Sequence, residues 1–246
     1  MRRITTTAAI LLLITLLCTG AQAAEKKLIY SRWVGPENYI FMSDASGKNE
    51  KKLFIGYDAE ISPDGKKIAY TKQHENGTGE RYIAIYDIAS KKTEVLKNIP
   101  LKDNYGPRWS KSGKAILFSH YTKSKVWRPA IYDMEKKSVK IIAMKVASPV
   151  GKKEMDIDIL SPFWSHDGEH IYGNDLYYLY KFSAASGKQE EVAAISSILP
   201  KGALLDSAVK FTVSDSGEAL LFAIGMEDER CAKCDAAATV DSYKGA

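Results

Sequence analysis

Cys231 and Cys234 form the one Cys-x-x-Cys motif of the sequence, a spacing that can bind a metal, exchange electrons or close a local disulfide. Structural zinc needs further ligands, and haem attachment needs a histidine after the second cysteine, where this chain has Asp235. A redox motif usually opens a helix beside a strand, and the flanking tail lacks that pattern. In an oxidising compartment we therefore predict a local disulfide, with redox activity or transient metal binding as the alternatives.

Acidic residues and histidines offer few other arrangements for chemistry. Asp156 and Asp158 share one face if their segment is extended, so they could bind a cation or a basic partner, although acids in loops are mostly just solvated. His166 and His170 flank a turn, and no carboxylate or cysteine cluster completes a metal site around them. The sequence has no Gly-x-Ser-x-Gly elbow, no phosphate-binding glycine loop and no His-Glu-x-x-His. We therefore predict no catalytic residue, no bound metal and no cofactor.

Aromatic residues outside the repeating pattern of the chain are the better candidates for a binding surface, because tryptophan and tyrosine dominate binding energetics. These residues are Trp33, Tyr105, Tyr121 and Trp127. Inserted segments at 73–81, 119–128 and 145–160 are further places where function can be added, since loops vary while a scaffold packs. We predict that the four aromatics, with the two aspartates above, contribute to a binding surface.

The elements that must position these residues follow an internal repeat. Each copy has an apolar or aromatic residue, a serine, two polar residues, a glycine, a polar pair and an apolar run. The copies are Ile61–Tyr70, Trp109–Phe118, Trp164–Tyr172 and Val213–Phe222, and their glycines lie 48, 55 and 49 residues apart. A glycine tolerates positive φ at a turn, and β-branched and aromatic residues favour strands, so each copy is predicted to be a β-hairpin. Trp109 and Trp164 hold equivalent positions, which predicts packing between sheets.

A second motif alternates with the first. It is an alternating apolar strand followed by a polar turn and another short strand. The strands are Tyr39–Asp44, Tyr82–Asp87, Pro129–Asp133 and Tyr177–Lys181, so that Lys181 is expected to stand where the other copies have aspartate. Two hairpins in each period of about 45 residues make four strands, which is the size of a propeller blade.

The segments Ser62–Tyr70 and Ile85–Lys92 resemble the paired motifs of TolB-type, WD-repeat-like propeller blades. The resemblance covers residues 27–225. It implies an all-β propeller of about five four-stranded blades, with four blades or an open array as alternatives. The chain opens with strands of the outer part of a blade and ends with strands of the inner part, an offset that suits ring closure. The family contains binding proteins as well as peptidase propeller domains and sugar lyases.

The N-terminus has the pattern of a secretory signal peptide. Arg2 and Arg3 precede the short apolar run Ala8–Leu17, and Ala21-Gln-Ala23 forms a small-x-small cleavage site. We predict a signal peptide at 1–23, a propeller at 24–225 and a polar tail at 226–246, with an uncleaved N-terminal anchor as the alternative. Removing the two arginines lowers the formal charge from +5 to +3, which is ordinary for a soluble domain and does not indicate nucleic-acid binding.

Together these features predict an exported, non-catalytic propeller, periplasmic or secreted, without a membrane span after signal cleavage. Its expected partner is a protein or an envelope component, held on a loop-lined face. The alternatives are a sugar lyase or another propeller enzyme, and a fragment of a larger propeller.

Overall fold

The computed structural model describes residues 26–74, 79–100, 103–142, 145–147, 149–151, 153–199, 203–204, 210–214, 220–222 and 225–226. Within these ranges the chain consists of β-strands joined by turns and loops, and the one helix is the short 3-10 helix η1 (Ile195–Ser197). The prediction of an all-β fold is confirmed. None of the described residues belongs to a helix of the length and apolarity that a bilayer span requires.

Three sheets contain four antiparallel strands each, in chain order. The second sheet consists of β4 (Tyr57–Ile61), β5 (Lys67–Gln73), β6 (Arg81–Asp87) and β7 (Thr93–Val95). The third sheet consists of β8 (Asn104–Trp109), β9 (Ala115–Tyr121), β10 (Trp127–Asp133) and β11 (Ser138–Ile141). The fourth sheet consists of β14 (Leu160–Trp164), β15 (His170–Asn174), β16 (Tyr178–Ser183) and β17 (Gln189–Ala194).

The units at either end have fewer strands. The first sheet has three, β1 (Lys27–Val34), β2 (Glu37–Asp44) and β3 (Lys51–Ile55). After the fourth sheet come two short pairs, β19 (Phe211–Val213) with β20 (Leu220–Phe222), and β18 (Ala203–Leu204) with β21 (Gly225–Met226). A further pair, β12 (Val146–Ala147) with β13 (Glu154–Met155), precedes the fourth sheet.

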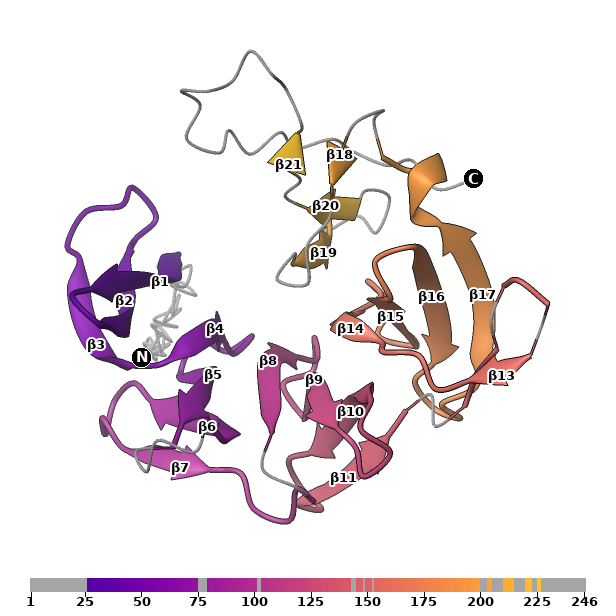
Figure 1. Ribbon diagram of the computed structural model, residues 1–246. Coiled ribbons are helices and arrows are strands. Elements are labelled where there is room, and N and C mark those ends of the chain that lie inside the picture. Colours follow the sequence, from indigo (N-terminus) through magenta and orange to yellow (C-terminus); the bar gives the residue numbers. More distant parts are fainter. Residues whose placement is uncertain are drawn as a thin grey trace, which may run out of the picture.

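The sheets stand side by side on an open arc (Figure 1). The first strand of each four-stranded sheet lies on the inner side of the arc, where β4 contacts β8, β8 contacts β14 and β14 contacts β19. Five units with incomplete ends agree with the sequence prediction. The ring closure suggested by the sequence is absent from the described residues, in which β1, β2 and β3 pair only with one another. The described sheets are therefore consistent with the open array that was the alternative expectation.

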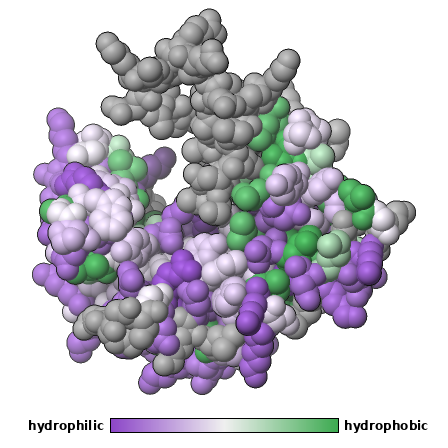
Figure 2. Space-filling view, in the orientation of Figure 1, coloured by the Kyte–Doolittle hydropathy of each residue, from purple (hydrophilic) through white to green (hydrophobic). Residues whose placement is uncertain are grey.

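The apolar core is divided among the spaces between neighbouring sheets. Phe54 of the first sheet packs against Tyr70 and Tyr86 of the second at ring distances of 4.4 and 4.5 Å. Separate buried clusters fill the spaces between the second and third sheets and between the third and fourth sheets. Hydrophilic residues cover most of the rim of the described sheets, and apolar residues show there in small groups (Figure 2).

The two repeat tryptophans connect neighbouring sheets, as predicted. The Trp109 indole N–H donates to the backbone oxygen of Glu60 at 3.2 Å, and the Trp164 indole N–H donates to the backbone oxygen of Arg108 at 3.2 Å. Each acceptor belongs to the first strand of the preceding sheet. The ring therefore fills space between two sheets while its polar edge finds a partner, which is how buried tryptophan is usually accommodated.

The recurring serine of the first motif closes the hairpin turn. The hydroxyl of Ser62 accepts a hydrogen bond from the backbone N–H of Lys67 at 2.9 Å, and those of Ser110 and Ser165 accept equivalent bonds at 3.0 and 2.9 Å. The glycine three residues after each serine has a φ of 70–75°, a conformation that favours glycine over other residues. These contacts confirm three of the predicted hairpins, whereas the turn of the fourth, at 215–219, lies outside the described residues.

The aspartate that ends the second motif organises the outer turn. Its side chain accepts backbone N–H groups at Asp44, Asp87 and Asp133. These bonds hold the pKa of the Asp87 and Asp133 carboxyls below the usual value, and at Asp44 the hydroxyl of Ser46 lowers the pKa most, followed by the backbone bonds. In the fourth sheet this position belongs to Ser183. Ser183 lies opposite His170 as Asp133 lies opposite Ala115, and both partners follow the recurring serine of their hairpin by five residues. The prediction that Lys181 replaces the aspartate is therefore wrong by two residues, because alternation along a strand fixes its face but not where it ends.

Candidate functional site

The inner strands of the arc line a central cavity of about 620 Å³. Its walls come from the first strands of the second, third and fourth sheets, from the edge of β1, and from the beginnings of β6 and β10. Pockets of 300–1,000 Å³ are typical of ligand sites. The cavity is lined by residues 29–31, 58–60, 105–108 and 160–162, with Arg81, Ser119, Trp127 and Lys210.

A β-bulge interrupts each of the three inner strands at the same place. The pairing register shifts between Tyr57 and Glu60, between Tyr105 and Arg108, and between Leu160 and Phe163. Each bulge holds one residue at positive φ, and all three of these residues line the cavity. They are Asp58 at 53°, Gly106 at 66° and Ser161 at 47°. Bulges re-aim side chains at the rims of barrels and beside active sites, and positive φ at non-glycine residues is often found at functional sites.

Charged residues of the cavity wall are paired across sheets. Asp58 accepts an ion-pair contact from Lys210 at 2.7 Å and a hydrogen bond from the Thr71 hydroxyl at 3.1 Å. Glu60 lies 3.8 Å from the Arg108 guanidinium and accepts the backbone N–H of Trp109 at 2.6 Å. Loss of water contact raises the pKa of the Glu60 carboxyl, an effect that outweighs the nearby positive charges.

Three of the four predicted aromatic residues meet beside this cavity, which Tyr105 and Trp127 line. Tyr121 and Trp127 are register partners at the end of the β9–β10 hairpin, and their rings lie 4.9 Å apart. The Tyr105 ring meets Trp127 edge-on at 4.8 Å. The Arg81 guanidinium lies 4.8 Å from the centre of the Tyr105 ring and 5.3 Å from that of Trp127, and its Nε bonds Asp103 at 2.7 Å. We call Arg81, Tyr105, Tyr121 and Trp127 the aromatic cluster.

Trp33 does not join the aromatic cluster. It lies near the β1–β2 turn with 60% of its surface exposed, and its contact is an edge-on approach to the Tyr57 ring at 6.1 Å. Tyr105, Tyr121 and Trp127 are by contrast half-buried. The structure thus separates the predicted aromatics into one cluster of three on the third sheet and one residue on the first sheet.

The two predicted aspartates differ in their roles. Asp158 accepts the backbone N–H of Trp127 at 2.8 Å, so its carboxylate helps to hold an aromatic residue in place. Asp156 is 75% exposed and lies 3.8 Å from Nη2 of Arg128. The segment that carries these aspartates is therefore attached to the start of β10.

Arg128 is a residue of this site that the sequence analysis missed. Its side chain is 1% exposed, and its Nη1 donates to the backbone oxygens of Trp127 and Ile157. Burial lowers the pKa of the guanidinium, and the charges of Asp156 and Asp158 oppose that effect. A buried arginine is rare unless it is paired, but a single arginine in a polar loop gives no signal of burial in the sequence.

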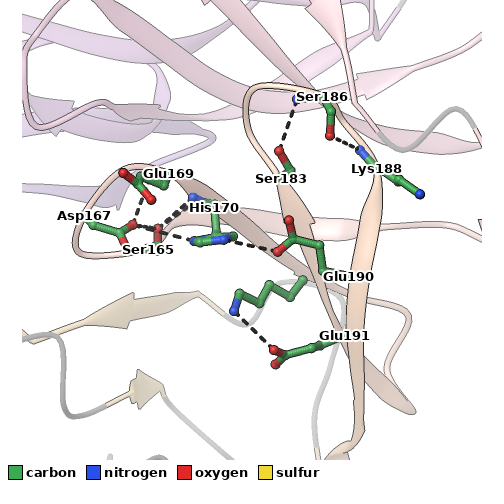
Figure 3. A network of polar contacts seen from close by, with 10 residues as sticks. Ser165, Asp167, Glu169, His170, Ser183, Ser186, Lys188, Glu190 and Glu191 are labelled. Carbon is green, nitrogen blue, oxygen red and sulfur yellow. Dashed lines mark hydrogen bonds and ion pairs between the residues drawn. The ribbon is translucent and has the colours of Figure 1, made fainter.

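His170 belongs to a polar network on the fourth sheet (Figure 3). Its Nε2 lies 3.1 Å from the Glu190 carboxylate and its Nδ1 lies 3.8 Å from Asp167. The Asp167 carboxylate accepts the backbone N–H of Glu169 at 2.8 Å, and Lys181 lies 3.3 Å from Glu191. Among the described residues, no group of three or more histidine, cysteine, aspartate or glutamate side chains is arranged to hold a metal ion.

Two of the sequence predictions fall outside the described residues. They are the disulfide between Cys231 and Cys234, and the signal peptide at 1–23.

Antiparallel sheets of up to four strands, set around a central cavity with their first strands inward, define the β-propeller class of folds. The sequence matches no protein-family model and no curated protein. The fold is that of the TolB-like, WD-repeat-like propellers. TolB from Acinetobacter baumannii matches with a TM-score of 0.59 at 18% identity over 89% of this chain and 53% of that chain. The chain therefore spans about half the length of that TolB.

Two further solved structures have the same architecture. A putative TolB from Agrobacterium tumefaciens gives a TM-score of 0.54 at 19% identity and covers 83% of this chain and 72% of that chain. The propeller domain of Cps50 (Swd1) from Myceliophteria thermophila gives 0.55 at 11% identity and covers 88% of this chain and 67% of that chain. Identities this low establish the shared fold, and function has to be argued from the site.

Proposed function

We propose that this protein is an exported, non-catalytic propeller that binds another protein or an envelope component through the aromatic cluster beside the central cavity. The observation that carries the proposal is the convergence of Tyr105, Tyr121 and Trp127 on Arg81 beside a cavity of about 620 Å³. Binding hot spots are enriched in tryptophan, tyrosine and arginine held in well-packed positions.

The cluster suits binding because its side chains are fixed before a partner arrives. Trp127 is held through its backbone by Asp158 and Arg128, and its ring is held by Tyr105, Tyr121 and Arg81. A preorganised surface loses little conformational entropy on association. The rigid sheets behind it supply the scaffold, as in other proteins whose loops bind while their sheets pack.

Export is proposed because the first 23 residues have the sequence of a signal peptide. The propeller is then formed by residues 24–225. The tail at 226–246 would carry a disulfide between Cys231 and Cys234 in an oxidising compartment. A periplasmic or secreted location would expose the aromatic cluster to envelope proteins. N-terminal sequencing of the protein recovered from the envelope tests this part of the proposal. A mature chain that starts at residue 24 or 25 is expected, and an intact Met1 would contradict it.

The binding proposal is tested by crosslinking the tagged full chain in its native envelope, followed by mass spectrometry of the captured proteins. The test variant carries Tyr121→Ala and Trp127→Ala together. The matched control is Tyr177→Ala, which removes a 74% exposed aromatic residue from another loop. We expect one reproducible partner that is captured by the original chain and the control but not by the test variant. All three chains must show the same thermal transition.

Capture of the same partner by the double variant would refute the assignment of the binding face. Capture of nothing by the folded and exported chain would refute the binding function itself.

A further inference from the structure

The first sheet contains the second, third and fourth strands of a repeat unit, while the described residues provide no first strand for it. Its β1 sequence Lys27-Leu-Ile-Tyr-Ser31 parallels Lys67-Ile-Ala-Tyr-Thr71 of β5. The pairing agrees, because Lys27 lies opposite Asp44 as Lys67 lies opposite Asp87. In the second sheet, β4 pairs with the inner edge of β5, whereas no described strand pairs with the inner edge of β1.

The free edge leaves apolar residues exposed that are buried in the equivalent strand. Ile68 and Tyr70 of β5 are 0% and 2% exposed, whereas Leu28 of β1 is 46% exposed. Trp33 and Val34 of the same strand are also exposed. Within the part of the chain that the structure describes, the backbone N–H and C=O at every other residue of this eight-residue strand have no strand partner, which makes the edge a template for another strand.

The central cavity reaches this edge. Ile29, Tyr30 and Ser31 all line it. Side chains of consecutive residues point to opposite faces of a sheet, so three consecutive lining residues mean that the cavity meets the edge of the strand and not one face. The same cavity is lined by Arg81, Tyr105 and Trp127. A segment held at the aromatic cluster is therefore next to the free edge of β1.

We propose that an extended segment of the partner protein adds to β1 as the missing first strand of the first sheet. This inference rests on the proposed function and names the part of the partner that enters the cavity. Strand addition of this kind obtains affinity from main-chain hydrogen bonds and specificity from alternate side chains.

The existing first strands define the chemistry of that segment. β4, β8 and β14 contain five, six and five residues and run antiparallel to their neighbours. Each ends on a large apolar residue opposite an isoleucine, as in the pairs Ile61–Ile68, Trp109–Ile116 and Trp164–Ile171. The corresponding residue of β1 is Leu28. The partner segment is therefore an extended run of five or six residues with a large aliphatic or aromatic side chain opposite Leu28.

The test places a photoreactive benzoylphenylalanine at Ser31, at Tyr121 or at Ser46 of the full chain in its native envelope. Ser46 is the matched control, because it is an exposed serine in the outer turn of the same sheet. Digestion of the adducts identifies the crosslinked partner segment. That segment is then made as a free peptide, and amide hydrogen exchange of the full chain is measured with and without it.

We expect adducts at Ser31 and Tyr121 but not at Ser46, and a peptide with the alternation described above. Saturating peptide should slow exchange of those amides of Lys27–Val34 that lie on the inner edge of β1, away from β2, at least about tenfold, because strand pairing protects backbone N–H groups. A peptide with N-methyl groups on its paired edge should lose this effect.

A partner captured at Tyr121 but not at Ser31, or a bound peptide that leaves exchange of β1 unchanged, would overturn the inference and leave the proposed function standing. An adduct between two copies of this chain, or within one copy, would overturn it in favour of self-pairing. Capture at neither site would overturn the proposed function and the inference together.

Discussion

The contact of Arg81 with the rings of Tyr105 and Trp127 can be tested as a coupling free energy. The perturbations are Arg81→Met, which keeps the aliphatic stem of the side chain, and Trp127→Leu, which removes the ring, followed by the double variant. The Arg81 side chain is 35% exposed and lies over two rings at 4.8 and 5.3 Å. Cation–π contacts contribute about 0.5–1 kcal/mol when exposed and about 2 kcal/mol when desolvated, so the expected coupling is about 1 kcal/mol.

Urea denaturation of the original chain, the two single variants and the double variant gives this coupling, provided that all four show the same dependence of the unfolding free energy on urea concentration. The ion pair of Arg81 with Asp103, in which each side chain is 35% exposed, is lost on Arg81→Met whether residue 127 is Trp or Leu, so its contribution cancels from the cycle. Lys136→Met serves as the control, since Lys136 is 77% exposed and its ion pair with Asp133 is expected to contribute nothing measurable. A coupling below about 0.3 kcal/mol would mean that the two changes are additive, and the proposed preorganisation of the aromatic cluster would be refuted.

Three further predictions concern the sheets behind the site. Burial lowers the pKa of His120, so the unfolded chain binds a proton there more readily than the folded chain does. The free energy of unfolding should therefore fall as the pH drops below about 6.5. In urea denaturation measured at a series of pH values, His120→Gln should reduce this fall. Gly173→Ala places a Cβ 2.5 Å from Ile159 Cγ2, so melts should show a loss of about 1–3 kcal/mol, and an unchanged stability would contradict the packing described here. Trp109→Phe removes the indole donor to Glu60, which should cost at least about 1 kcal/mol in the same assay.

The repeating parts of the fold could be predicted because their residues are determined locally. A serine that accepts a backbone N–H five residues later and a glycine with positive φ act within a single hairpin, as at Ser62 and Gly65. The alternation of each strand identifies its two faces. The same reasoning located the tryptophans between sheets, since Trp109 and Trp164 recur at the same position of each repeat.

The site itself was only partly predictable, because its geometry depends on contacts between sheets. The sequence identified Tyr105, Tyr121 and Trp127 as residues outside the repeat, but nothing in it shows that they meet while Trp33 lies apart. Arg128 and Asp58 gave no local signal, since the burial of one and the positive φ of the other come from neighbouring strands. One signal was present in Gly106-Pro107 and Ser161-Pro162, because a proline within a strand often marks a bulge.

The division of the core into separate clusters between neighbouring sheets has a thermodynamic consequence. Among the described residues each cluster joins two neighbouring sheets, so the array is expected to behave as a linear series of coupled units and not as one all-or-none core. In such a series a terminal unit has one stabilising interface where an internal unit has two, and it is expected to melt first. A strand that completes the first sheet would act as a removable cap on that series. The occupied chain would then gain cooperativity as well as stability, and its unfolding would begin from the opposite end.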